Sequence, residues 1–421
     1  MKIERIIHSK NFSILISLLP VLLITGPFLS DLLVSISSFI FLVYIFSERK
    51  FKLLNNNFFY YFIFFCLIFI VCSLLSNDIL LSFESSLLYF RIFIFSFLIC
   101  YLINYDNKIL MYFYKIFLFC FLILIIDGYI QYIFGKNIFL MPSDYGRISS
   151  FFGSELILGS YLVRLFPLFF SLFLIKKKNK YDNYIIGTVF ISLDILIFIT
   201  GERVAFFLLN ISTIFIIILI SKYKIFRLLT FLISIIIIFA ITYSNENIMK
   251  RMIDEPIKDL QSNFQKKTFD YNTEETIKIF SAEHTNIYYA AYEMFKDKPF
   301  LGHGPKLFRV ICKEYKYKNN NTCSTHPHNF YLQLLSETGL IGFLFIFIAF
   351  IYVLKESIII LLKKKYASPQ EICLLGCFFL TLWPLTPGGN FFNNWLMIVY
   401  SLPLGFYLNL KIYKKNFAEE F

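Results

Sequence analysis

The chain has 421 residues, of which 58% are hydrophobic, and it carries a formal net charge of +12. Its mean hydropathy of +0.67 lies well above the range of a soluble domain. Apolar runs of about 18 to 22 residues recur along it, and this is the length that crosses a bilayer as a helix. Such continuous runs exclude a transmembrane β-barrel, whose strands alternate apolar and polar side chains. We therefore expect an all-α, polytopic integral membrane protein.

Twelve apolar segments predict twelve membrane-spanning helices in chain order. The first segment has no small-residue cleavage site and leads at once into the second, so we interpret it as a retained helix rather than a signal peptide. The predicted division is nine spans in residues 1–243, one loop outside the membrane in 244–337, and three spans with a tail in 338–421. The predicted spans are 11–29, 31–48, 58–75, 85–104, 109–134, 154–175, 184–200, 203–220, 227–243, 338–355, 371–386 and 391–409.

Lysine and arginine gather in every second connection between these spans. By the positive-inside rule, these connections and both termini lie in the cytoplasm. We call the lysines and arginines of these connections the cytoplasmic fringe. They face anionic lipid and account for most of the net charge, so no nucleic-acid partner is needed to explain it. The residues of the fringe are Lys2, Arg5, Lys10, Arg49, Lys50, Lys52, Lys108, Lys176, Lys177, Lys178, Lys180, Lys222, Lys224, Arg227, Lys363, Lys364, Lys365, Lys411, Lys414 and Lys415.

The other connections place three polar segments on the opposite, outer face. They are the loop GKNIFLMPSDYGRISSFFGSE, a tight turn over 200–203, and a long segment over 245–327 that is expected to be helical and to cover the outer ends of the spans. Within it, TNIYYAAYEMFK predicts a helix over 285–296. Cys312 and Cys323 flank a Lys- and Asn-rich run there. An oxidising periplasm would join them as a disulfide, and two free thiols are the alternative.

Four charged residues interrupt the apolar segments, namely Arg91, Asp127, Arg164 and Asp194. Each costs about 3 kcal/mol at the bilayer centre, so each is expected to pair, to reach the interface or to face a polar cavity. Structural ion pairing explains them as well as function does. We predict that Arg91, Arg164 and Asp127 contribute to substrate binding, and we assign no role to Asp194.

Two arginines stand on the outer face beside glycines, Arg147 before the sixth span and Arg203 at the start of the eighth. A guanidinium offers a planar fork that matches phosphate oxygens and stays charged. Free N–H groups at helix starts add to the attraction for an anion. The pair therefore predicts a binding site for a lipid diphosphate. The alternative is that each side chain only extends toward the lipid head groups.

The stretch CSTHPHNFYLQLLSETGLIG carries the densest polar pattern of the chain. After His328, polar side chains at Asn329, Gln333, Ser336 and Glu337 recur with helical spacing. This predicts a short amphipathic helix over 328–337 at the membrane surface. Asn329 and Gln333 on its polar face are candidates for substrate binding.

His328 is expected in the first turn of that helix, where the positive dipole end favours neutral imidazole. A neutral histidine can accept a proton at neutral pH, so His328 is the candidate general base. His326 is expected to position substrate. A zinc site with His303 or His284 as third ligand is an alternative, but no known ligand spacing matches and we expect no metal. The other alternative is that these histidines only cap the helix.

These residues carry a resemblance to a known family. His328-Asn329, nine residues and Gly339-x-x-Gly342 match the pattern H-[N/S/Q]-x9-G-x-x-G of O-antigen ligases and the related O-antigen polymerases. The segments FLGHGPKLF, RISSFFGSELILGSYLVRLFPL, TGERVAFF, DGYIQYIFGKNIF and FFNNWLMIVYSLPLGFYL are also similar to elements of that family. One departure is Glu202, where the family usually has a small residue, and its role stays open.

The resemblance implies a twelve-span glycosyltransferase of the GT-C kind in a bacterial inner membrane, with its site on the periplasmic side. Such an enzyme takes a glycan from an undecaprenyl-diphosphate carrier, without a nucleotide, metal or other cofactor. Arg147 and Arg203 would hold the diphosphate, and His328 would deprotonate or position the acceptor hydroxyl. His303 is a further candidate for substrate binding.

Three functions are weighed against one another. A ligase passes the glycan to lipid A-core, and the H-N-x9-G-x-x-G pattern favours this function. A polymerase passes it to another carrier-linked repeat unit. A lipid-linked glycan flippase is less supported, because transporters usually show internal repeats around a midplane site. The sequence does not identify the sugar.

Overall fold

The computed structural model describes residues 2–143, 146–176, 181–258, 282–314 and 323–413. Within these ranges the regular elements are helical, which confirms the all-α expectation. Five lysines of the predicted cytoplasmic fringe lie outside the described residues, namely Lys177, Lys178, Lys180, Lys414 and Lys415.

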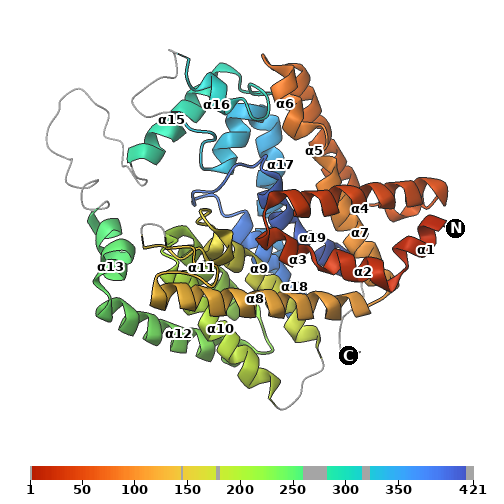
Figure 1. Ribbon diagram of the computed structural model, residues 1–421. Helices are drawn as coiled ribbons and strands as arrows, with labels where there is room; N and C mark the ends of the chain where they lie inside the picture. Colours follow the sequence, from red (N-terminus) through yellow and green to blue (C-terminus); the bar gives the residue numbers. More distant parts are fainter. Residues whose placement is uncertain (1, 144–145, 177–180, 259–281, 315–322, 414–421) are drawn as a thin grey trace, which may run out of the picture.

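The helices follow one another along the whole chain (Figure 1). The first half contains α1 (Lys2–Ile7), α2 (Lys10–Ser17), α3 (Leu19–Ile24), α4 (Pro27–Ser47), η1 (Phe51–Leu53), α5 (Asn57–Leu74), α6 (Ile79–Ser86), α7 (Phe90–Tyr105), α8 (Lys108–Phe134), η2 (Ser150–Phe152), α9 (Leu158–Ile175) and α10 (Asp182–Ile199). The second half contains α11 (Arg203–Leu219), α12 (Lys224–Ser244), α13 (Glu246–Met249), the π-helical turn η3 (Lys250–Asp254), α15 (Ala282–Asp297), α16 (Phe308–Ile311), α17 (Phe330–Leu361), α18 (Pro369–Thr381) and α19 (Asn394–Tyr413).

Nine helical stretches in the described residues are long and apolar enough to cross a membrane. Three further apolar helices are shorter: Lys10–Ile24, Arg203–Leu219 and Pro369–Thr381. Each of the twelve predicted spans overlaps one of these twelve helices, but the three short ones do not reach the length of a span. A polytopic membrane protein is therefore confirmed, whereas the count of twelve spans stays a prediction.

The boundary between the first two predicted spans is wrong. The sequence predicted spans over 11–29 and 31–48, but α3 ends at Ile24 and α4 begins at Pro27. Gly26 between them has φ +119°, a conformation that side chains rarely adopt, and Pro27 follows at the first helical position. The break thus comes from a Gly-Pro pair inside what reads as a continuous apolar run.

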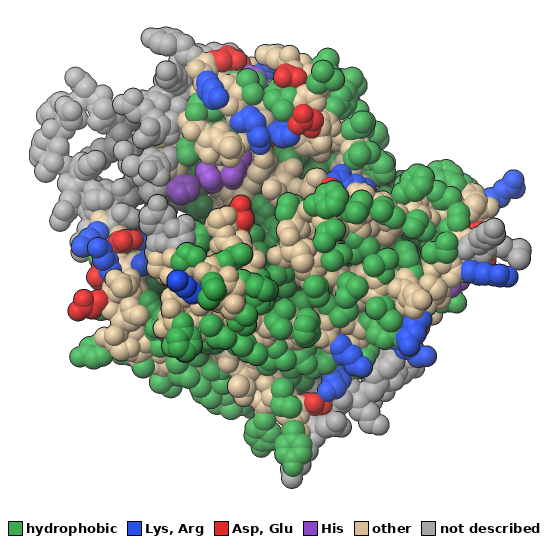
Figure 2. Space-filling model, viewed as in Figure 1, with side chains coloured by type: hydrophobic (Ala, Val, Ile, Leu, Met, Phe, Trp, Pro, Cys, Tyr) green, Lys and Arg blue, Asp and Glu red, His purple; other side chains and the backbone are tan. Residues whose placement is uncertain are grey.

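The helices pack around α9, in which 89% of the residues are buried. It contacts α8, α10, α11, α18 and α19, while α7 packs against α19 and α4. By contrast, α12 and α17 lie at the outside, and most residues of their apolar stretches are not buried. Hydrophobic side chains cover much of the face shown in Figure 2, and large ones such as Phe239 are widely exposed, as expected for a surface in contact with lipid.

A buried ion pair joins α10 to α12. The carboxylate of Asp194 accepts two hydrogen bonds from the guanidinium of Arg227, at 2.8 and 3.0 Å, and a third from Ser234. Thr213 of α11 accepts from the same guanidinium at 2.8 Å. Structural ion pairing therefore explains why Asp194 lies inside an apolar segment. The sequence placed Arg227 in a cytoplasmic connection, but α12 begins three residues earlier and Arg227 is fully buried.

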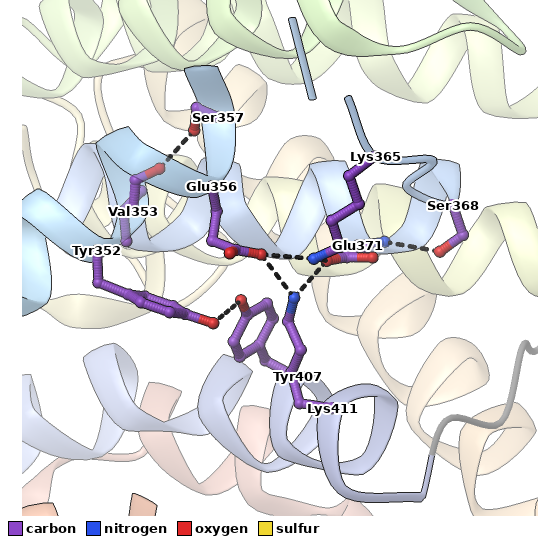
Figure 3. Close-up of polar contacts among 9 residues, drawn as sticks. All are labelled: Tyr352, Val353, Glu356, Ser357, Lys365, Ser368, Glu371, Tyr407 and Lys411. Atoms are coloured by element: carbon purple, nitrogen blue, oxygen red, sulfur yellow. Dashed lines mark hydrogen bonds and ion pairs between the residues drawn. The ribbon is translucent and has the colours of Figure 1, made fainter. Parts of the chain in front are cut away.

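Four charged residues join α17, α18 and α19 near the C-terminal end of α17, and we call them the lysine–glutamate quartet (Figure 3). Lys411 bonds to Glu356 at 2.9 Å and to Glu371 at 2.6 Å. Lys365 reaches the same two carboxylates at 2.6 and 3.4 Å. Each lysine is therefore shared by both glutamates. The quartet balances its charges and fixes three helices to one another.

A small body lies at one end of the helices. The predicted helix over 285–296 is present as α15, which packs against the N-terminal part of α17. A hydrophobic cluster that includes Ala291, Met294, Phe308 and Cys312 joins α15 to α16. Figure 1 shows this body, α15 and α16, over the end of α17.

Candidate active site

The loop that carries Arg147 is held by two buried side chains of α8. The carboxylate of Asp127 accepts from the Ile138 N–H at 2.9 Å and from the Ser150 hydroxyl at 2.5 Å. Gln131 accepts from the N–H groups of Ser149 and Ser150 at 3.0 and 2.7 Å. The predicted substrate-binding residue Asp127 thus has both oxygens occupied by the loop. It positions the segment next to Arg147.

Glu202, the departure from the family pattern, caps a helix. Its carboxylate accepts from the N–H groups of Gly159 and Ser160 at 2.7 and 3.0 Å, and from the Ser160 hydroxyl at 2.8 Å. These groups open the first turn of α9, where N–H groups have no partner within the helix and the dipole favours a negative charge. A Cβ at Gly159 would approach Thr200 Oγ1 to 2.8 Å, so glycine permits this close contact.

Arg147 and Arg203, which the sequence paired, belong to a group of three arginines with Arg251 of η3. The Arg251 Nε donates to the Gly201 carbonyl at 3.1 Å, and the Arg251 carbonyl accepts from the Arg203 Nε at 2.9 Å. Arg147 lies against the same glycine, because a Cβ at Gly201 would be 3.5 Å from its Cγ. We call Arg147, Arg203 and Arg251 the arginine cluster.

Counted over the described part of the chain, the arginine cluster has more positive than negative charge. The carboxylate of Glu255 forms an ion pair with Arg203, and both side chains are partly exposed, at 44% and 37%. Partial burial lowers the pKa of Arg251 from its usual value, and the neighbouring charges of Arg147 and Arg203 lower it further. Like charges that crowd in this way favour an anionic ligand.

The second group of candidate residues lies where α17 begins. The sequence placed His328 in the first helical turn, but α17 starts at Phe330 and Asn329 is its N-cap. His328 therefore precedes the helix and adopts φ +57°. Asn329 Oδ1 accepts from the N–H groups of Tyr331 and Leu332, and its amide donates to the Pro384 carbonyl at 2.8 Å. Both polar ends of Asn329 are thus used in fixing the helix start.

Three histidines meet in front of this helix start. The ring of His328 lies 4.2 Å from that of His326 and 5.6 Å from that of His284, measured between centroids. His328 Nε2 is 3.0 Å from the Ser324 hydroxyl. Figure 2 shows histidine side chains gathered below α15 on the face in view. His284 comes from α15, so two distant segments form the histidine cluster of His284, His326 and His328.

Burial keeps two of these imidazoles neutral. It lowers the pKa of His326 to about 4, with His328 and Arg309 as smaller, electrostatic causes. Burial also lowers the pKa of His328, and His284 adds to the effect. The sequence expected a neutral His328 because of the helix dipole. The protonation state agrees, but its cause is burial next to a second imidazole.

The glycines of the GHGP and G-x-x-G motifs let two segments cross closely. Gly339, with φ +64°, interrupts the helical geometry of α17, and the freed N–H of Leu340 donates to the Pro299 carbonyl at 2.7 Å. A Cβ at Gly339 would lie 2.3 Å from the Phe300 backbone, and one at Gly302 would lie 2.4 Å from Glu337. No side chain fits at either position.

Gln333 is also committed to structure. Its amide nitrogen donates to Glu337 at 3.0 Å and to Asn390 at 2.7 Å, while its oxygen accepts from the Phe391 N–H at 2.8 Å. Glu337 in turn accepts from the Phe308 N–H at 2.9 Å, at the start of α16. The polar stripe predicted along this helix is therefore real, but Gln333 and Glu337 are buried and hold neighbouring segments in place.

Three other predicted site residues lie apart from the two clusters. His303 is buried, with Nε2 3.1 Å from the Met294 carbonyl at the end of α15. Arg91 forms an ion pair with Asp31 at 2.6 Å, beside a groove of about 320 Å³. Arg164 is buried in α9 with its guanidinium 5.1 Å from the Tyr400 ring centre.

A disulfide joins two segments of the small body formed by α15 and α16. Cys312, at the C-terminal end of α16, is paired in a disulfide with Cys323, and their Cα atoms are 5.3 Å apart. Cys323 stands three residues before His326. The bond therefore ties the segment that carries the histidines to α16. Among the residues that the structure describes, no group of three His, Cys, Asp or Glu side chains could hold a metal ion.

Sequence reasoning missed Arg251 and Arg309. Arg251 directly follows Lys250, and Arg309 stands alone in the short apolar stretch LFRVI. Neither surrounding pattern distinguishes a functional arginine from a solvated one. Arg309 of α16 is close enough to His326 to lower the pKa of its imidazole. His284 was considered only as a metal ligand, because the fold that brings α15 to the start of α17 is not visible in the sequence.

Residues 187–347 match the family model described as O-antigen ligase. This stretch of the chain is therefore similar to the O-antigen ligases. This confirms the resemblance, and the matched stretch contains Arg203, Arg251 and the histidine cluster. Together with the apolar helices, it indicates a glycosyltransferase-like enzyme of the bacterial inner membrane that takes part in lipopolysaccharide biosynthesis. A comparison of the chain with curated proteins gave no match.

Proposed function

We propose that the protein is an O-antigen ligase, which transfers a glycan from an undecaprenyl-diphosphate carrier to lipid A-core at the periplasmic face. One observation carries the proposal: the stretch that matches the O-antigen ligase family holds two of the three clustered arginines, Arg203 and Arg251, together with the histidine cluster, in which burial lowers the pKa of His326 and His328. A transferase with a lipid-diphosphate donor needs both, since one binds the leaving group and the other receives a proton. We further propose twelve spans of the GT-C kind, with both termini cytoplasmic.

The proposed reaction assigns one step to each cluster. The acceptor hydroxyl oxygen attacks the anomeric carbon of the donor glycan, and the bond from that carbon to the diphosphate oxygen breaks. His328 takes the hydroxyl proton, because its imidazole is neutral. The guanidinium groups of Arg147 and Arg203 stabilise the charge that develops on the leaving diphosphate. No metal or other cofactor takes part in this proposal.

The remaining assigned residues act on these groups or on substrate. Asp127 and Gln131 fix the loop of Arg147, and Asn329 fixes the backbone next to His328. His326 positions the acceptor, with its neutral ring against that of His328. We keep Arg91, Arg164 and His303 as proposed contacts of more distant parts of the lipid or glycan.

The test is a transfer assay with the purified protein in proteoliposomes. A carrier-linked donor on the outside and an acceptor glycan should give the joined glycan and an equal amount of free carrier diphosphate, with a chelator present. Movement of the donor across the bilayer without product would instead indicate a flippase. In cells, a deletion strain should accumulate long carrier-linked chains if the protein is a ligase, and single repeat units if it is a polymerase.

A further inference from the structure

The contacts of η3 with the turn before α11 carry an inference that deepens the proposed function and rests on it. We propose that Arg251 and Glu255 form a displaceable clamp: Arg251 binds the carrier diphosphate together with Arg147 and Arg203, and Glu255 occupies the phosphate position on Arg203 until the donor arrives. Neither residue follows from the motifs of the sequence.

The position of Arg251 is fixed from two sides. Its Nε donates to the Gly201 carbonyl at 3.1 Å, and its own carbonyl accepts from Arg203 at 2.9 Å. A Cβ at Gly201 would stand 2.6 Å from the Arg251 Nε, so only glycine allows the side chain to lie there. Because this bond uses Nε, the two terminal nitrogens keep the fork that matches phosphate oxygens.

The charges around Arg251 leave room for an anion. Among the residues that the structure describes, the carboxylates of Glu202 and Glu255 interact with guanidinium groups of the cluster. Glu202 has both oxygens on the first turn of α9, so it is committed to the helix. Glu255 is the other, and a carboxylate on an arginine resembles a phosphate in geometry and charge. The cluster therefore contains a bound anion of its own chain at the place where a diphosphate would bind.

Glu255 is suited to leave this place. Its side chain is 44% exposed, and Arg203 is 37% exposed, so their ion pair adds little to stability. It follows directly on the π-helical turn Lys250–Asp254, an irregular geometry that is frequent at functional sites. A diphosphate carries more negative charge than one carboxylate and can reach all three arginines, so it should displace Glu255 from Arg203.

The experiment measures binding of undecaprenyl diphosphate and of inorganic pyrophosphate to the full-length protein in detergent. Arg251→Ala should weaken the binding of both about tenfold or more, and Arg251→Lys should restore it in part. Glu255→Gln should strengthen binding about threefold to tenfold, since a competing anion is removed. Lys250→Ala and Glu246→Gln change exposed neighbouring charges and should leave binding within about twofold of the wild type.

The outcomes separate the clamp from the proposed function. Thermal unfolding of each variant reports whether it is folded, and Glu255→Gln alters a partly exposed side chain that should not affect folding. If Arg203→Ala abolishes binding but Arg251→Ala and Glu255→Gln bind like the wild type, the clamp is wrong and the donor site stands. If Glu255→Gln binds more weakly than the wild type, Glu255 is not a competing anion. If the wild type binds neither ligand, the proposed function and the clamp are both overturned.

Discussion

Two groups of charged side chains lie at different ends of the helices and are built in different ways. The lysine–glutamate quartet matches two lysines with two glutamates, and each lysine contacts both carboxylates. The arginine cluster places three guanidinium groups around one turn, with Glu255 as the carboxylate paired to Arg203. The charges of the quartet balance one another, and its contacts join three helices. Among the residues that the structure describes, the arginine cluster has a surplus of positive charge, and such a surplus attracts an anionic ligand.

The first prediction exchanges one cation in each group. Arg203→Ala should reduce glycan transfer about 100- to 1000-fold, because the charge on the leaving diphosphate loses one fixed donor. Arg203→Lys should recover part of the rate, since it keeps the charge but not the fork. Lys411→Met in the quartet is the matched control, and its folded fraction should transfer at the wild-type rate. If Arg203→Ala is as active as the wild type, Arg203 does not act on the donor and only contacts lipid head groups.

A second prediction concerns the segment between the histidines and α16. Cells should contain Cys312 and Cys323 as a disulfide, and mass mapping of the unreduced protein detects it. Closing a loop of this size is worth about 2 to 3 kcal/mol in the chain-entropy model, so Cys312→Ser should destabilise α16 by that amount in hydrogen exchange. Cys323→Ser should have the same effect, and the quartet should not respond to either. Complete alkylation of both thiols without reductant would contradict the bond.

The third prediction sharpens the structural half of the comparison. Lys411→Met leaves Glu356 and Glu371 with one lysine between them, so it should cost about 1 to 3 kcal/mol of unfolding free energy. Combining it with Glu371→Gln should cost less than the sum of the two single changes, because the second change removes the unpaired charge. The free energy of unfolding is measured in detergent for the wild type, the two single variants and the double variant. Strict additivity would show that the quartet is not a network.

A fourth prediction uses pH. The pKa of His328 lies below its usual value, because burial disfavours the imidazolium. Only the neutral ring accepts a proton, so transfer should be constant above about pH 6.5 and fall about tenfold per unit below the pKa of His328. An inflection above pH 7 would require a raised pKa and would contradict the burial of this ring.

The stability of the folded protein should also decrease at low pH. The pKa of His326 is about 4 in the folded chain, whereas an unfolded histidine titrates near 6.5. The unfolded state therefore binds more protons in this window, and the free energy of unfolding falls as pH decreases from about 6.5 to about 4. His326→Gln should reduce that slope and leave the inflection in activity in place. An unchanged slope would show that His326 is already protonated or exposed.

Periodicity and apolar length predicted most of the helices, since spans are set by local composition. The division between α3 and α4 was misplaced, because one Gly-Pro pair inside an apolar run determines it. The helix over 285–296 was predicted from its pattern, but its packing against α17 depends on contacts distant in sequence. That packing is what brings His284 to His328.

The candidate site was predictable where a short motif carries it and not elsewhere. Arg147, Arg203, His326 and His328 stood out through neighbouring glycines and prolines, and the structure groups them into two clusters. Asn329 and Gln333 stood out equally, yet their polar atoms are used by the backbone of adjacent segments. A sequence shows which side chains can form hydrogen bonds, and only the fold shows which of them are already formed.

The central claim is that the arginine cluster binds the donor and His328 performs the proton transfer. The most direct test measures donor binding and turnover separately in purified His328→Ala, with His326→Ala alongside. We predict that His328→Ala binds the carrier-linked donor like the wild type but loses about 100- to 10,000-fold in turnover, and that His326→Ala loses less. Wild-type turnover in His328→Ala, or activity that a chelator removes and zinc restores, would contradict the account.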